Sequence, residues 1–190
     1  MQKIFVSALI VSATLLSAAR AEDSAKANNQ TAGKVPADSK IEIASFAEIQ
    51  KAVAKYQGKV VVVKYWSSWC PPCVKEFPEF VQLHKDLGDK IVCLTIDVDF
   101  AGAEGEKPEQ HRENVLGILH KNQATMRHFI SSDPDLAVFE KLHVGSVPAL
   151  HVFDRAGKLH QRFDNENAAF GKEGFSINKH VKPVVVELLK

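Results

Sequence analysis

Residues 61–78 read VVVKYWSSWCPPCVKEFP and hold a strand pattern, a closely spaced cysteine pair and the beginning of a helix pattern. Residues 60–66 are β-branched and aromatic apart from one lysine, which predicts a central strand buried on both faces. After Cys70, apolar side chains at helical spacing predict a helix through about Leu87. The two cysteines of this stretch, Cys70 and Cys73, therefore lie where a strand passes into a helix.

Strands and helices alternate along the rest of the sequence. The expected strands cover residues 41–43, 91–98, 126–130, 149–153 and 159–163, with a turn at 154–157 between the last two. The expected helices follow a capping box at Ser45 and Glu48, cover 111–121, begin at Asp133 or Asp135, and cover 179–189. This order predicts an α/β fold in which a mixed sheet carries helices on both faces.

The N-terminal residues have the order of a secretory signal. Lys3 precedes an apolar segment at 4–16, and Ala19-Arg20-Ala21 forms a small-x-small cleavage site. We therefore predict a signal peptide at 1–21, a flexible polar linker at 22–40 and a single domain at 41–190. We therefore expect the protein to be exported. If the signal is not cleaved, the alternative is a membrane-tethered form.

The composition speaks against nucleic-acid binding and against a disulfide scaffold. With 190 residues and a net charge of +1, the chain has no basic patch or stripe of the kind that binds nucleic acid. Three cysteines are too few for a disulfide scaffold, so stability has to come from an apolar core. Cys93 lies in an apolar strand and is expected to be a buried core residue without a disulfide partner. We expect a monomer.

The spacing of Cys70 and Cys73 at a helix start suits thiol-disulfide exchange. A thiolate attacks a disulfide, and a helix N-terminus stabilises that anion. Cys70 is the expected nucleophile and Cys73, one turn inward, the resolving thiol. Pro71 and Pro72 stiffen the first turn at little cost, because first-turn amides have no intrahelical partner. The cysteines carry two electrons themselves, so no cofactor is expected.

Two separated motifs carry a resemblance to a known family. Residues 61–78, followed by Gly145-Ser146-Val147-Pro148-Ala149, resemble the exported, TlpA/ResA-like branch of the thioredoxin superfamily. That branch includes the thiol-disulfide proteins of bacterial cytochrome c maturation. The resemblance covers 41–190 and implies a thioredoxin-like fold. It also implies protein thiols and disulfides as substrates, together with a membrane or soluble redox partner.

The resemblance also implies a binding groove around the cysteines. Val147 is expected to offer its backbone to an extended partner chain, and Pro148 to follow a cis peptide bond rather than the trans bond of an ordinary edge strand. Trp69 is expected to shield and pack the pair and, with Pro71 and Pro72, to contact the partner.

Two charged residues near the cysteine pair each allow two interpretations. Glu76 lies at the position of an acid that moves protons in this branch, although a surface glutamate near a helix N-terminus is the alternative. Lys64 occupies the position of a buried acid in thioredoxin, on the same strand face as Val62 and Trp66. We expect its ammonium group to reach solvent. The alternative is a lysine buried near the cysteine pair, which would be neutral unless paired and would favour thiolates if charged.

Two other functions are compatible with a cysteine pair in this position. A metal-handling module of the same fold, for instance for copper, would need a suitably placed histidine, and His143 and His151 flank the Pro148 loop. No ligand spacing accompanies the cysteine pair, so no metal site is predicted. The other alternative is a structural disulfide without redox activity.

Overall fold

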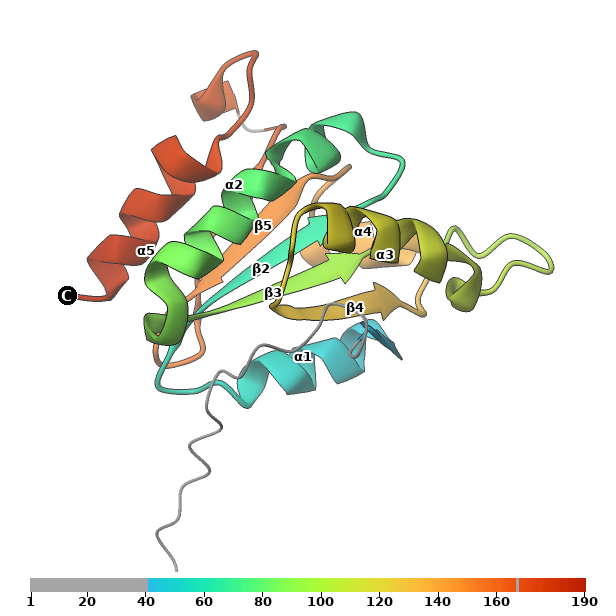
Figure 1. The fold of residues 1–190 in the computed structure, drawn as a ribbon, viewed down its shortest axis with the longest axis horizontal. Helices are drawn as coiled ribbons and strands as arrows, with labels where there is room; N and C mark the ends of the chain where they lie inside the picture. Colours follow the sequence, from blue (N-terminus) through green and yellow to red (C-terminus); the bar gives the residue numbers. More distant parts are fainter. Residues whose placement is uncertain (1–40, 167) are drawn as a thin grey trace, which may run out of the picture. The chain divides into compact units, whose positions relative to one another are not determined.

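A six-stranded mixed sheet forms the centre of the computed structural model, which describes residues 41–166 and 168–190 (Figure 1). Its strands are β1 (Ile41–Ala44), β2 (Val60–Trp66), β3 (Ile91–Asp97), β4 (Arg127–Ser131), β5 (Ala149–Phe153) and β6 (Leu159–Asp164). They lie in the order β1-β4-β3-β2-β5-β6. The first four are parallel to one another, whereas β5 is antiparallel to both β2 and β6. The predicted signal peptide and linker lie outside the described residues.

Helices cover both faces of this sheet, which confirms the predicted α/β architecture. The α-helices are α1 (Phe46–Ala54), α2 (Pro71–Leu87), α3 (Arg112–Lys121), α4 (Asp135–Leu142) and α5 (Lys182–Leu188). Figure 1 shows α2 and α5 side by side on one face, with α1 on the other side of the sheet. No helix among residues 41–166 and 168–190 has the length and apolar character needed to cross a bilayer.

Local sequence signals explain where these helices begin. Ser45 caps α1 in the predicted capping box: its hydroxyl accepts from the backbone N–H of Glu48, whose carboxylate accepts from the Ser45 N–H. Cys70 caps α2, and α2 runs without a break for 17 residues, through Pro78.

Two apolar cores lie on the two faces of the sheet. Every residue of β2 is buried, as predicted for a central strand, so alternate side chains enter each core. The first core joins the sheet to α2, α3 and α5; among its members are Val62, Trp66, Cys73, Phe77, Phe80, Cys93, Leu119 and Val185. The second core joins the sheet to α1 and α4 and includes Ile49, Val53, Val63, Tyr65, Leu94, Phe129 and Val138.

The C-terminal segment differs from the prediction. A π-helical turn, η5 (Ile177–Val181), precedes α5, where the sequence predicted one α-helix over 179–189. Pro183 has no N–H to donate to the carbonyl of Lys179, so the α-helical bonding pattern is interrupted at this point. Segment η5 packs against α2 and completes the cover of that face.

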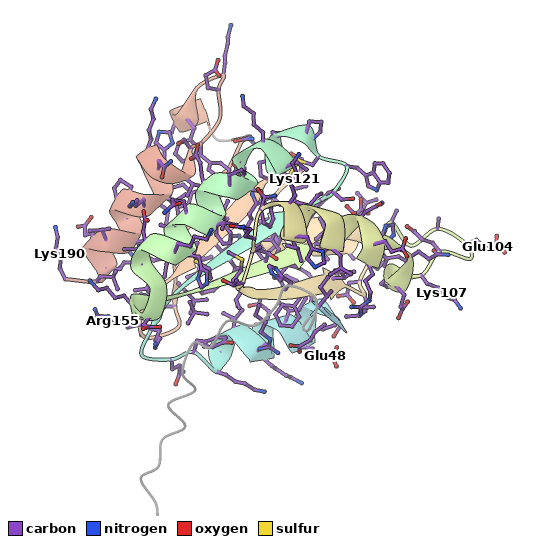
Figure 2. The ribbon with its side chains drawn as sticks, in the orientation of Figure 1. Glu48, Glu104, Lys107, Lys121, Arg155 and Lys190 are labelled. Atoms are coloured by element: carbon purple, nitrogen blue, oxygen red, sulfur yellow. A yellow bond between two sulfur atoms is a disulfide. The ribbon has the colours of Figure 1, made fainter. Side chains whose placement is uncertain are left out.

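The parallel strands bring several loops to one edge of the sheet. Strands β2, β3 and β4 all end there, α2 begins just after β2, and the antiparallel strand β5 begins at the same edge. Figure 2 shows Glu104 and Lys107 projecting at this edge on the loop after β3, while Arg155 and Lys190 lie at the opposite end. Residues that are distant in sequence therefore meet beside Cys70.

Candidate active site

A disulfide joins Cys70 and Cys73 at the start of α2. The two Cα atoms are 5.2 Å apart, within the range that a disulfide bridges. Cys73 is fully buried against the core under α2, whereas Cys70 is partly exposed. Of the two sulfur-bearing residues, Cys70 is the one that a second protein can reach.

The helix start directs one amide at the outer sulfur. Pro71 and Pro72 have no N–H, so the first amide of α2 that can donate belongs to Cys73, and it points at Cys70 Sγ over 3.2 Å. This N–H and the positive end of the helix dipole favour negative charge on Cys70 Sγ once the disulfide is reduced.

The loop before β5 approaches the same sulfur from the other side. The carbonyl oxygen of Val147 lies 3.5 Å from Cys70 Sγ, and the peptide bond from Val147 to Pro148 is cis, as the resemblance implied. Pro148 is buried and Val147 is partly exposed. The backbone of Val147 therefore lines the approach to the disulfide.

The residues around Cys70 are largely open to solvent. Pro71 and Pro72 are exposed, and Trp69 is 73% exposed. Most of the Trp69 surface faces solvent, and its expected role in shielding the pair stays a prediction. An apolar side chain held in water beside a reactive sulfur is suited to contact a partner protein.

Lys64 does not reach solvent, and the prediction that it does is wrong. Its side chain is 0% exposed, and its Nζ forms an ion pair with Oε1 of Glu76, whose side chain is 14% exposed. Strand β2 is covered on this face by α2, so no route to water is open to Lys64, and a carboxylate from that helix meets the charge instead.

Burial affects the two partners in opposite ways. It raises the pKa of the Glu76 carboxyl, and the neighbouring Lys64 ammonium opposes that rise. It also lowers the pKa of the Lys64 amine, which the Glu76 carboxylate opposes. A largely buried carboxyl with a raised pKa, one turn along the helix from Cys73, can act as a proton acceptor and donor beside that cysteine.

The structure adds an acidic pair that the sequence interpretation missed. Asp99 accepts hydrogen bonds from the backbone N–H and the hydroxyl of Ser68, in the loop that leads to Cys70. Asp97 is 0% exposed, and burial, reinforced by the charge of Asp99, raises its pKa well above the usual range. The sequence signal was available in Asp97-Val98-Asp99, directly after an apolar strand that runs parallel to β2.

The histidines flanking the Pro148 loop lie in different surroundings. His143 is exposed at the end of α4, whereas His151 is 5% exposed beside the ring of Tyr65. Burial lowers the pKa of His151 to about 4, so it is neutral at physiological pH. No group of three or more His, Cys, Asp or Glu side chains in the described part of the chain is arranged to hold a metal ion. Cys93 is a buried free thiol, as predicted.

Sequence comparison gives a family match and several relatives. A family model described as Redoxin matches residues 31–172. The thiol-disulfide oxidoreductase ResA of Bacillus thuringiensis is 24% identical over 123 residues, which are 63% of this chain and 62% of ResA. The sporulation thiol-disulfide oxidoreductase A of Bacillus subtilis is 23% identical over 104 residues, 54% of this chain and 58% of that protein. The chain thus spans about 60% of the length of these curated relatives.

Solved structures with the same arrangement confirm the predicted thioredoxin-like fold. A putative thiol:disulfide interchange protein DsbE from Chlorobium tepidum superposes with a TM-score of 0.55 at 19% identity, covering 73% of this chain and 85% of that chain. The exposed lipoprotein thioredoxin Etrx1 from Streptococcus pneumoniae gives a TM-score of 0.51 at 26% identity, covering 71% of this chain and 89% of that chain.

Proposed function

Because the chain belongs to the Redoxin family, we propose that it is a protein thiol-disulfide oxidoreductase that works through Cys70 and Cys73. One observation carries the proposal: the partly exposed residue Cys70 caps α2, and its sulfur is bonded to that of the fully buried Cys73. A partner can reach only the outer residue, and the helix start favours a thiolate there. The pair thus offers one sulfur for attack and one for resolution.

The exchange conserves atoms and electrons. In the reduced protein, the Cys70 thiolate attacks one sulfur of a partner disulfide, forms a mixed disulfide and releases the other partner sulfur as a thiolate. Cys73 then loses its proton and attacks Cys70 Sγ. The internal disulfide forms, the second partner sulfur leaves, and two electrons have passed to the partner. Oxidation of a partner dithiol is the same sequence in reverse.

Glu76 is proposed to take the proton of Cys73. A buried thiol has a raised pKa, so the resolving cysteine needs an acceptor within the protein. Glu76 lies three residues further along α2, and such residues are neighbours on a helix surface. Its largely buried carboxyl supports this role better than the alternative of a surface glutamate.

The surface beside the disulfide is proposed to bind an extended segment of the partner. The Val147 carbonyl lies 3.5 Å from Cys70 Sγ, Pro148 is buried, and Trp69, Pro71 and Pro72 are exposed apolar residues next to Cys70 in the chain. Main-chain hydrogen bonds to an extended segment give affinity with little sequence selectivity. This suits an enzyme that acts on several protein partners.

We propose that the chain works outside the cytoplasm as a monomer. Residues 1–21 have the order of a secretory signal, and the pneumococcal neighbour is described as an exposed lipoprotein. Expression of the full chain with a C-terminal tag, followed by fractionation and N-terminal sequencing, tests the location. A tagged protein found in the cytoplasm with residue Met1 intact contradicts export.

Trapping of mixed disulfides tests the activity. A Cys73→Ser variant keeps the nucleophile but lacks the resolving thiol, so we expect it to accumulate covalent, reductant-sensitive complexes with oxidised protein substrates. The matched Cys70→Ser variant is expected to form none. Equal trapping by both variants, or none by Cys73→Ser, would refute the assigned roles. A pair that resists mild reductants would instead indicate a structural disulfide.

A further inference from the structure

Lys64 is a charged residue on a face of β2 whose other residues belong to the apolar core. Its side chain is 0% exposed, between the sheet and α2. Its register neighbours on the adjacent strands are Thr95 and Leu150. Leu150 has no polar side-chain group, and the Thr95 hydroxyl bonds to His128 Nδ1 at 2.6 Å. The carboxylate of Glu76 is therefore the side chain that meets the Lys64 charge.

The ion pair connects the strand to the resolving cysteine. Glu76 and Cys73 lie three residues apart on α2, so their side chains are neighbours on one side of the helix. Phe77 packs beside the ion pair. Lys64 Nζ lies 5.9 Å from the centre of the Phe77 ring, which also packs on Trp66. The Glu76 carboxylate is thus paired with the buried ammonium group of Lys64 and has limited access to water.

We infer that Lys64 is a positioning residue, whose buried ammonium group holds the Glu76 carboxylate ionised and aimed at the resolving thiol of Cys73. The inference rests on the proposed function and names a further residue for it. Without the ammonium group, the buried Glu76 would keep its own proton at neutral pH, because desolvation disfavours an isolated carboxylate. It would then be unable to take the proton of Cys73.

The proton path balances with the exchange reaction. Cys73 S–H gives its proton to Glu76, and the resulting thiolate attacks Cys70 Sγ in the mixed disulfide. The partner's sulfur leaves as a thiolate and takes a proton from Glu76 or from solvent. Lys64 keeps its proton throughout and only compensates the charge of the carboxylate.

Other ionisable groups lie on this face of the sheet or on the segments packed against it. They include Glu79 and His84 on α2, Cys93 and Asp97 on β3, His128 on β4, and Lys179 and His180 on η5. Of these, Glu79 acts on the Glu76 carboxyl, and its negative charge raises the pKa of that carboxyl. Lys64 is the cation that opposes it.

Reaction of the reduced protein with an aromatic disulfide such as 5,5′-dithiobis(2-nitrobenzoate) separates the two steps. The first release of coloured thiolate reports attack by Cys70, and the second reports resolution by Cys73. Both rates are followed by stopped flow over about pH 4 to 9, which spans the ordinary pKa values of carboxyl and thiol groups. The variants are Lys64→Met, Lys64→Gln, Glu76→Gln and the double variant Lys64→Met/Glu76→Gln.

The second release at pH 7 should be slower in Lys64→Met by about tenfold or more, with its pH midpoint moved upward. The first release should change by less than about twofold, since the Cys70 thiolate is stabilised by the helix start. Glu76→Gln should slow the second release as well. The double variant should be no slower than Glu76→Gln alone, because both changes remove the same acceptor.

Several results would overturn the role of Lys64. These are an unchanged pH midpoint in Lys64→Met, slowing of both releases by the same factor, or additive effects in the double variant. Lys64→Gln, which keeps a hydrogen-bond donor without the charge, provides a second test if Lys64→Met does not fold. Lys182→Met, which removes a half-exposed lysine paired with Asp86 on α2, is the matched control and should leave both releases unchanged. Absence of the first release in the unmodified protein would count against the proposed function instead.

Discussion

Removal of the Glu76 carboxylate should make the stability of this protein depend on the charge of Lys64. The two side chains are 0% and 14% exposed, so Glu76→Leu leaves an ammonium group in the core with no charged partner. Breaking a buried ion pair on one side costs about 3 to 5 kcal/mol. The free energy of unfolding should therefore fall by that amount at pH 7.

The direction of the pH dependence follows from the linkage of proton binding to folding. Burial lowers the pKa of Lys64 in the folded state, and the variant lacks the carboxylate that opposes this. The unfolded chain then binds the proton more tightly, so the unfolding free energy rises with pH and recovers toward about pH 10.4. The slope has an upper limit of about 1.4 kcal/mol per pH unit.

Urea denaturation of the oxidised protein, monitored by circular dichroism from neutral to alkaline pH, measures the loss of unfolding free energy and its dependence on pH. Asp86→Leu is the matched control on the same helix: its pair with Lys182 is 34% and 36% exposed and should contribute much less to stability, because water screens exposed charges. Lys64→Met/Glu76→Leu should regain most of the loss, because apolar side chains of similar volume replace both charges. An equal effect of Glu76→Leu and Asp86→Leu, or a flat pH profile, would refute the reasoning.

Three further predictions concern the rest of the domain. Phe80→Ala, at a 0% exposed position of the core under α2, should lower the unfolding free energy by about 3 to 5 kcal/mol. Leu136→Ala, at a 74% exposed position, should change it by less than about 0.5 kcal/mol. Chemical denaturation of the two variants measures the difference. Ser45→Ala removes the capping box of α1 and should cost about 1 kcal/mol in the same assay. Burial lowers the pKa of His128 and of His151 to about 4, so the unfolded chain binds their protons first, and stability should fall as the pH drops from about 6.5 toward 4. His151→Phe should flatten that fall, and an unchanged slope would show that His151 does not take part.

Much of the fold follows from local patterns. The capping box at Ser45, the buried run of β2 and the cysteine at the start of α2 are each signals that span only a few residues, and the structure has all three. Such features depend on backbone hydrogen bonds and on side-chain periodicity, which operate over one or two turns. The alternation of strands and helices likewise predicted a mixed sheet covered on both faces.

Neighbouring residues alone are enough to place Cys70 at the start of a helix directly after a buried strand. The pairing of Lys64 with Glu76 and the hydrogen bonds from Ser68 to Asp99 depend instead on how distant parts of the chain pack. Each of these contacts joins side chains on different elements, and which of them meet depends on how α2 and β3 pack against β2. A lysine on a strand reaches water or a buried carboxylate according to what covers it, and that cover lies elsewhere in the chain.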